Sequence, residues 1–279
     1  MDNTQNMSRL CLITALSAET RPLLDALKLR QMQAGHLRVY GADSILLLET
    51  GPGKLNAAAC TAAMLQHYPE VSAVMNIGIA GGRFDYAQTV LAHHIKDQSS
   101  GAQWYPHIPG SPVFRALPSA SICTVDVPET NYAHGMLYDM EAAGIFIASA
   151  RCLSTSQIHS VKVVSDNPEY GLERINKQTV NSLIREAIPT IKPLIDVMLE
   201  RCANQEQHQA NLVESYVESM CTRIKHSVND KQQLRRLVQQ HVGRTGELPN
   251  VDDMTVSAKT LRHLLSTSLN LQAIVYGDQ

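Results

Sequence analysis

The sequence has few of the features that mark nucleic-acid-binding, membrane or secreted proteins. Its 279 residues carry 24 lysines and arginines against 26 aspartates and glutamates, and the formal net charge of -2 excludes a basic field that would attract nucleic acid. It has no apolar run of the roughly 20 residues that a membrane-spanning helix needs. Residues 1–9 are polar and lack the apolar stretch of a signal peptide. We therefore expect a cytoplasmic protein that binds neither nucleic acid nor a membrane.

Cysteine usage is equally uninformative about chemistry. The six cysteines are scattered, and no two form a Cys-x-x-Cys pair. Most lie in apolar segments, which indicates buried, reduced thiols. His93 and His94 are adjacent, but neighbouring side chains of a strand point to opposite faces, so the two rings do not readily share one ion. The sequence therefore predicts no metal and no other cofactor.

What the sequence does contain is an alternation of apolar runs and helical patterns. Continuous apolar runs are typical of strands that are covered on both faces. Such runs occupy residues 10–16, 44–50, 71–79 and 158–164, and the helical patterns occupy residues 55–67, 140–152 and 173–202. This alternation predicts an α/β fold with a mostly parallel core sheet. The stretch 97–118, which is rich in glycine, proline and serine, predicts a loop.

The composition changes near Asn204. Beyond it glutamine, histidine, serine and charged residues dominate, and apolar residues recur at helical spacing, as Leu212, Tyr216 and Val217 do. We therefore divide the chain into a main domain, residues 1–203, and a C-terminal helical appendage, residues 204–279, whose role the sequence does not identify.

Three acidic residues stand where elements of the main domain begin or end. Glu19 follows the first strand, Glu141 lies at the start of helix 140–152, and Asp166 closes the strand 158–164. In an open α/β sheet, ligands bind in the crevice beyond the carboxyl ends of the strands. Fixed carboxylates there suit chemistry that protonates a leaving group and stabilises a developing cation. Singly, each is equally well explained as a residue of a helix start or a turn.

Five short motifs, taken in order, are more specific. They are ALSAE at 15–19, TGPGK at 50–54, NIGIAGG at 76–82, YDMEA at 138–142 and VSD at 164–166. Over roughly residues 8–202 the chain resembles the purine nucleoside phosphorylase/nucleosidase family, and within it the methylthioadenosine/S-adenosylhomocysteine nucleosidases. The resemblance implies a three-layer fold with a curved, barrel-like mixed sheet flanked by helices. It also implies cleavage of the N-glycosidic bond between a purine and a ribose, and assembly as a homo-oligomer such as a dimer.

The resemblance further implies roles for individual residues. Asp166 matches the residue that donates a proton toward purine N7, and Glu19 matches the one that orients the attacking water. Glu141 matches the acceptor of the ribose hydroxyls. The other expected substrate-binding residues are Met140 beside the sugar, Gly78, Ile79 and Gly81 of the glycine turn, Lys162 on the strand before Asp166, and Val127 and Pro128 near the base.

The chemistry of the bond is consistent with these roles. Cleavage leaves an oxocarbenium-like ribose, and the base leaves more easily once a ring nitrogen is protonated. An aspartate with an ordinary pKa of roughly 3.9 is a poor acid at neutral pH, so Asp166 is expected to be desolvated or hydrogen-bonded into its neutral form. Glu141 is expected to stay ionised, so that its charge opposes that of the ribosyl cation.

The chain departs from the family pattern in ways that leave alternatives open. Ile79 replaces a serine of the glycine turn, Lys162 stands where an arginine is common, and the segment between Gly82 and Asp139 is shorter than the family norm. Base and sugar recognition are therefore expected to be remodelled.

Hydrolysis is favoured over phosphorolysis, because Asn76 and Ile79 replace an arginine and a serine of the phosphorylases and Glu19 would repel phosphate. Lys54, at a helix start after Gly-Pro-Gly, still offers a charge for phosphate. A non-catalytic nucleoside-binding or regulatory protein on the same scaffold is a third possibility.

Overall fold

The computed structural model describes residues 9–133, 135–223, 228–245 and 248–249. The chain forms two compact units, and the boundary between them falls between Ala203 and Asn204. Residues 250–279 of the appendage expected from the sequence lie outside the described residues.

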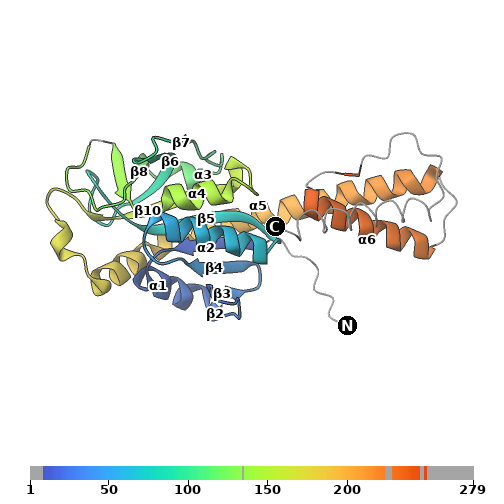
Figure 1. The fold of residues 1–279 in the computed structure, drawn as a ribbon, viewed down its shortest axis with the longest axis horizontal. Coiled ribbons are helices and arrows are strands. Elements are labelled where there is room, and N and C mark those ends of the chain that lie inside the picture. The colour runs from blue at the N-terminus through green and yellow to red at the C-terminus, as the bar shows by residue number, and fades with distance from the viewer. Residues whose placement is uncertain (1–8, 134, 224–227, 246–247, 250–279) are drawn as a thin grey trace. The chain divides into compact units, whose positions relative to one another are not determined.

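The first unit alternates strands and helices along most of its length (Figure 1). Its strands are β1 (Arg9–Thr14), β2 (Arg30–Gln31), β3 (Arg38–Ala42), β4 (Ile45–Glu49), β5 (Val71–Gly82), β6 (Thr89–Asp97), β7 (Gln103–Trp104), β8 (Ser119–Thr124), β9 (Met136–Asp139) and β10 (Ile158–Asp166). The helices among the described residues are α1 (Ser17–Leu27), α2 (Lys54–His67), α3 (Pro112–Arg115), α4 (Ala142–Ser149), α5 (Lys177–Arg223) and α6 (Val228–Thr245), and single 3-10 turns cover Thr155–Gln157 and Leu172–Arg174.

The sheet is half open and half closed, and the long strand β5 belongs to both halves. On one side β5 pairs with β1, which pairs in turn with β4, β3 and β2. On the other side β5 pairs with both β10 and β9, while β6 and β8 complete the circuit between these two. Five strands, β5, β10, β6, β8 and β9, therefore close into a ring. The predicted mixed, barrel-like sheet is confirmed.

Strands β1 and β4 of the open half bury both faces, which explains their continuous apolar runs. The alternate residues Leu10 and Leu12 of β1 face one apolar cluster with Leu23 of α1 and the α5 residues up to Cys202. The intervening residues Cys11 and Ile13 face a second cluster with α2 and α4. Helices thus cover both faces of the sheet, as predicted, and Figure 1 shows α2 and α4 side by side across one of them.

A third apolar cluster joins the ring of strands to α4. It includes Ala80 of β5, Leu137 of β9, Val164 of β10 and Phe146 of α4, all of them buried. This packing fixes the start of α4 against the carboxyl ends of β5 and β10, the edge of the sheet where the sequence places its acidic residues.

The described part of the second unit is a pair of helical segments, the part of α5 after Ala203 and α6. Val213 and Val217 pack against Leu234 and Val238. Arg235 donates two hydrogen bonds to Glu214, at 2.6 and 2.7 Å. Residues 204–223 and 228–245 of this unit are therefore helical, as expected. None of the described helices is long and apolar enough to cross a membrane.

Some short elements were not predicted. The strands β2, β3 and β9 had no sequence signal of their own, and the expected loop 97–118 contains β7 and the short helix α3. Helix α4 begins at Ala142 rather than at Met140, because Met140 and Glu141 form the bend between β9 and the helix, with Glu141 as its N-cap residue.

Gly144 allows α4 to approach the first turn of α2. A Cβ atom at this position would lie 2.2 Å from the carbonyl oxygen of Lys54. Gly144→Val should therefore push the helices apart and lower the free energy of unfolding by about 3 kcal/mol, measured by urea denaturation. Ile147→Val is the matched control on the same helix. Ile147 is 42% exposed, so this substitution should lower the free energy of unfolding by less than about 0.5 kcal/mol. Equal losses in the two variants would contradict the close packing.

Candidate active site

A buried lysine lies among the carboxylates. Lys162 of β10 has a side chain that is 1% exposed, and its Nζ pairs with Asp139 Oδ2 at 2.7 Å. Burial alone lowers the pKa of Lys162, but the negative charges of Asp139, Glu141 and Glu19 outweigh it and raise that pKa above its ordinary value. The carboxylates therefore favour the charged form of Lys162, and a buried cation requires such partners.

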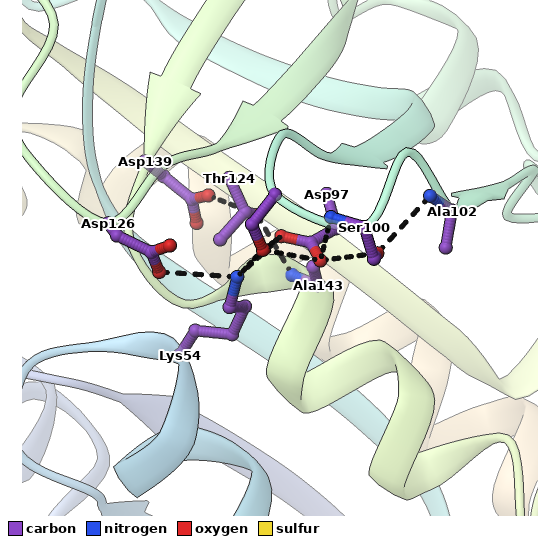
Figure 2. A network of polar contacts seen from close by, with 9 residues as sticks. Lys54, Asp97, Ser100, Ala102, Thr124, Asp126, Asp139 and Ala143 are labelled. Carbon is purple, nitrogen blue, oxygen red and sulfur yellow. Dashed lines mark hydrogen bonds and ion pairs between the residues drawn. The ribbon is translucent and has the colours of Figure 1, made fainter.

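Asp139 is held on three sides. Besides Lys162, its carboxylate accepts hydrogen bonds from the Thr124 hydroxyl at 2.7 Å and from the backbone N–H of Ala142 at 2.8 Å. The Thr124 hydroxyl oxygen accepts in turn from the N–H of Ala143 at 3.0 Å (Figure 2). These contacts satisfy donors of the first turn of α4, a place where the helix dipole favours negative charge. Asp139 was not predicted as a site residue, although it lies within the motif 138–142.

Glu19 lies at the start of α1, is 3% exposed and is bound by the backbone. Its carboxylate accepts from the N–H groups of Ala15 at 3.0 Å, Leu16 at 2.9 Å and Ile79 at 3.0 Å. Burial raises the pKa of Glu19, and the backbone donors and Lys162 oppose that rise only in part. Glu19 therefore caps the helix and also ties β1 to β5.

Gly78 explains how Glu19 and Lys162 come together. A Cβ at this position of β5 would lie 2.9 Å from Glu19 Oε1 and 3.5 Å from Lys162 Nζ. Both charged groups therefore lie over the same bare segment of backbone. Any larger residue at 78 would force the carboxylate to move.

Glu141 completes the cluster from the residue before α4. Its Oε1 accepts from the backbone N–H of Gly53 at 2.8 Å. Burial and the charge of Asp139 raise the pKa of Glu141 to about 7, against the opposing effects of Lys162 and the Gly53 N–H. The expectation that Glu141 is fully ionised at neutral pH is thus too simple, because in the ligand-free protein its protonation is finely balanced there.

Asp166 ends β10 and is 3% exposed. Lys162 lies opposite Gly78, and an irregularity between Val164 and Asp166 then places Asp166 opposite Gly81. One carboxylate oxygen accepts from the Ser165 hydroxyl, and the other accepts from the Tyr132 hydroxyl. A Cβ at Gly81 would lie 2.2 Å from Asp166 Oδ2. The expected acid is therefore buried and already hydrogen-bonded within the protein.

The structure thus gathers Glu19, Glu141 and Lys162, together with the unpredicted Asp139, into one cluster. Asp166 stands four residues beyond Lys162 on the same strand, and Tyr132, its partner, was not predicted either. Tyr132 carried no sequence signal, since it lies in a polar stretch without periodicity.

The remaining predicted residues have different surroundings. Met140 is half-buried between Asp139 and Glu141. The side chain of Ile79 packs against the apolar cluster that α1 and α5 cover, and its backbone N–H contributes to the site. Val127, at 74% exposure, and Pro128 are exposed in the connection after β8, and their role beside a base stays a prediction.

Lys54 is bound by other carboxylates rather than left free for an anion. Its Nζ contacts Asp97 at 2.6 Å and Asp126 at 3.2 Å, and it donates to Ser99 at 2.6 Å (Figure 2). Burial tends to raise the pKa of Asp97, but the hydrogen bonds from Lys54, Ser100 and Ser99 dominate and lower that pKa to about 2. The charge of Lys54 is therefore compensated already. Among the described residues, no group of three histidine, cysteine or acidic side chains is arranged to hold a metal ion.

Comparisons with known proteins agree with this architecture. No protein-family model matches the chain. A curated 5'-methylthioadenosine/S-adenosylhomocysteine nucleosidase of Bacillus cytotoxicus is 32% identical over 117 residues, a match that covers 37% of this chain and 50% of that protein. The match therefore spans half the length of that relative.

Solved structures extend the likeness over the first unit. The apo 5'-methylthioadenosine nucleosidase of Arabidopsis thaliana superposes with a TM-score of 0.59 at 15% identity, over 70% of this chain and 97% of that one. A nucleosidase of Colwellia psychrerythraea in complex with adenine gives a TM-score of 0.56 at 17% identity, over 70% and 96% of the two chains. At such identities the structures show the fold alone. They confirm the nucleoside phosphorylase-like fold, and with the curated relative they confirm the resemblance found in the sequence.

The ion pair of Lys162 can be tested through stability. Lys162→Met would leave the buried charge of Asp139 without its cation and should lower the free energy of unfolding by about 3–5 kcal/mol. The matched control is Lys192→Met. The side chain of Lys192 is 55% exposed and pairs with Asp196 at 3.4 Å, so its loss should lower the free energy of unfolding by less than about 0.5 kcal/mol. Adding Asp139→Asn to Lys162→Met should recover part of the loss in urea denaturation. Failure to recover any of it would contradict the pairing.

The raised pKa of Glu141 predicts a pH dependence of stability. Between the ordinary value of 4.5 and the folded value of about 7, the folded state holds a proton that the unfolded state has released. Stability therefore falls as the pH rises through this window and levels off above it. Glu141→Gln should remove this contribution. In urea denaturation, the free energy of unfolding of the variant relative to that of the wild type should therefore rise between about pH 5 and about pH 8. Parallel curves for the two proteins would refute the assignment.

Proposed function

We propose that the chain is a purine nucleosidase, which cleaves the N-glycosidic bond by hydrolysis through an oxocarbenium-like transition state. The observation that carries this proposal is that Glu19 and Lys162 meet over Gly78 of β5, while Glu141 interacts with the charge of Lys162 and Asp166 lies farther along β10. Three carboxylates that are far apart in the sequence, of which Glu19 and Asp166 are buried and Glu141 is half-buried, lie at one edge of the sheet, which suits a reaction at a sugar–base bond.

The charges of the cluster suit a developing cation. Glu19, Asp139 and Glu141 surround the single positive charge of Lys162, so the cluster carries more negative than positive charge once Glu141 is ionised. A ribosyl cation next to Glu141 would favour that ionisation, and the fixed carboxylates would stabilise the cation without reorganisation. In this assignment Asp166 protonates the purine, Glu19 orients the water, and Glu141 and Met140 hold the sugar.

The same charges favour water over phosphate as the nucleophile. The two lysines nearest the cluster are committed, Lys162 to Asp139 and Lys54 to Asp97 and Asp126. An incoming phosphate dianion would therefore meet carboxylates whose cations are already paired. Phosphorolysis remains the alternative that the assay below separates from hydrolysis.

The similar proteins support a purine nucleoside as the ligand class. One solved relative was crystallised with adenine, and a mutant nucleosidase of Helicobacter pylori holds 5'-methylthioadenosine in its active site. The expected homo-oligomeric state and cytoplasmic location rest on the same family resemblance. The proposed active-site residues all lie within residues 1–203.

A non-catalytic binding protein on this scaffold is the second candidate, and the contact between Tyr132 and Asp166 favours it. The Tyr132 hydroxyl is hydrogen-bonded to the carboxyl group of Asp166, which a catalytic acid must instead present to the base. The retention of Glu19 and Glu141 together with Asp166 favours the enzyme, since a binding protein has no need of all three.

Incubation of the full chain with adenosine, inosine, 5'-methylthioadenosine and S-adenosylhomocysteine, with and without phosphate, would test the proposal. Free base and free sugar without phosphate are expected, whereas a phosphate-dependent sugar 1-phosphate would identify a phosphorylase. Asp166→Asn should lower the rate by about 10²–10⁴-fold, because it removes the proton donor. Asp196→Asn, at a 59%-exposed side chain, should leave the rate unchanged. Binding of these nucleosides without any release of base would support the second candidate instead.

A further inference from the structure

Tyr132 is the residue of the site that neither the sequence nor the proposed function explains. It lies in the connection between β8 and β9, which holds no helix or strand among its described residues. Its neighbours Asn131 and Ala133 are exposed, yet Tyr132 itself is 5% exposed. A single side chain of an irregular segment is therefore inserted into the interior.

The inserted side chain ends on the expected catalytic acid. The Tyr132 hydroxyl donates to Asp166 Oδ2, and Ser165 donates to Oδ1. Burial, followed by the hydrogen bond and charge of Asp166, raises the pKa of Tyr132, so the hydroxyl stays protonated and acts as the donor. Glu129 and Glu173 add to this effect from the same connection and from the turn after β10.

The surroundings of Tyr132 leave it little freedom while it is in place. A Cβ at Gly81 would lie 2.9 Å from Tyr132 Cε1 and 2.2 Å from Asp166 Oδ2, so the ring and the carboxylate are packed against the same point of β5. Arg83, just after β5, donates through Nε to the carbonyl oxygen of Tyr132 at 2.6 Å. Polar contacts at its two ends thus hold the residue, and both can be exchanged for contacts with water or a ligand.

We propose that Tyr132 is a specificity-determining gate at the base end of the site. Its hydroxyl takes the Asp166 oxygen that a purine base would use, so a base enters only when it displaces Tyr132 and replaces that hydrogen bond. The inference rests on the proposed function for the placement of the base at Asp166. It adds that the segment between Gly82 and Asp139, which is shorter in this chain than in the family, supplies a side chain that competes with the base for Asp166.

Direct binding of adenine to the full chain, measured by calorimetry, tests the gate. Tyr132→Phe keeps the ring but removes the competing hydroxyl, and it should bind adenine about tenfold more tightly than the wild type, the effect of one hydrogen bond. Tyr132→Ala removes the ring as well and should bind at least as tightly as Tyr132→Phe. Circular dichroism and thermal unfolding would establish that both variants are folded.

The matched control is Tyr170→Phe. Tyr170 stacks on Tyr86 with ring centroids 4.5 Å apart, is 39% exposed, and lies in the turn after Asp166. Its hydroxyl is not part of the gate, so adenine should bind this variant as it binds the wild type.

The outcomes separate the gate from the proposed function. Equal or weaker adenine binding by Tyr132→Phe, or no binding by the wild type and both Tyr132 variants, overturns the gate even if the wild type cleaves nucleosides. Tighter binding by both Tyr132 variants supports the gate, even if the wild type cleaves no nucleoside and the proposed enzymatic function fails.

Discussion

The ion pair between Lys162 and Asp139 is the interaction on which the arrangement of the site depends. Lys162 belongs to β10 and Asp139 to β9, and β5 lies between these strands in the ring. The pair passes over Gly78, where the absence of a side chain leaves room for it and for the Glu19 carboxylate. One buried ammonium therefore aligns β10, the start of α4 and the start of α1. Removing it would leave three carboxylates at close quarters with no compensating charge.

Much of this arrangement follows from the sequence because parallel strands bring their carboxyl ends to a common edge. The apolar runs of β1, β4, β5 and β10 identify those strands, and the residues that follow them lie at that edge. Glu19, Glu141 and Asp166 were found in this way. The burial of Asp166 was expected as well, because it follows an apolar strand, whereas Glu19 and Glu141 taken singly are equally well explained as solvated residues of a helix start. The helical spacing after Asn204 likewise indicated the helices of the second unit.

The contacts that complete the site were not predictable, because each depends on a partner that is remote in the sequence. Asp139 precedes a helix as many acidic residues do, and only the fold brings Lys162 to it. The replacement of serine by Ile79 suggested a lost contact, yet the side chain packs into an apolar cluster and the backbone N–H holds Glu19. Strand β9 has four residues and gains its pairing from β5 and β8 rather than from its own pattern.

The way in which the ring of strands closes has a consequence for its mechanics. Strands β5 and β9 join through only two residue pairs, Gly81 with Tyr138 and Gly82 with Leu137, fewer than any other neighbours in the ring. Local opening of a protein concentrates where the fewest interactions must be broken. At this seam, local opening of the ring would break the fewest strand pairings. The length of the four-residue strand β9 therefore sets how many residue pairs oppose such an opening.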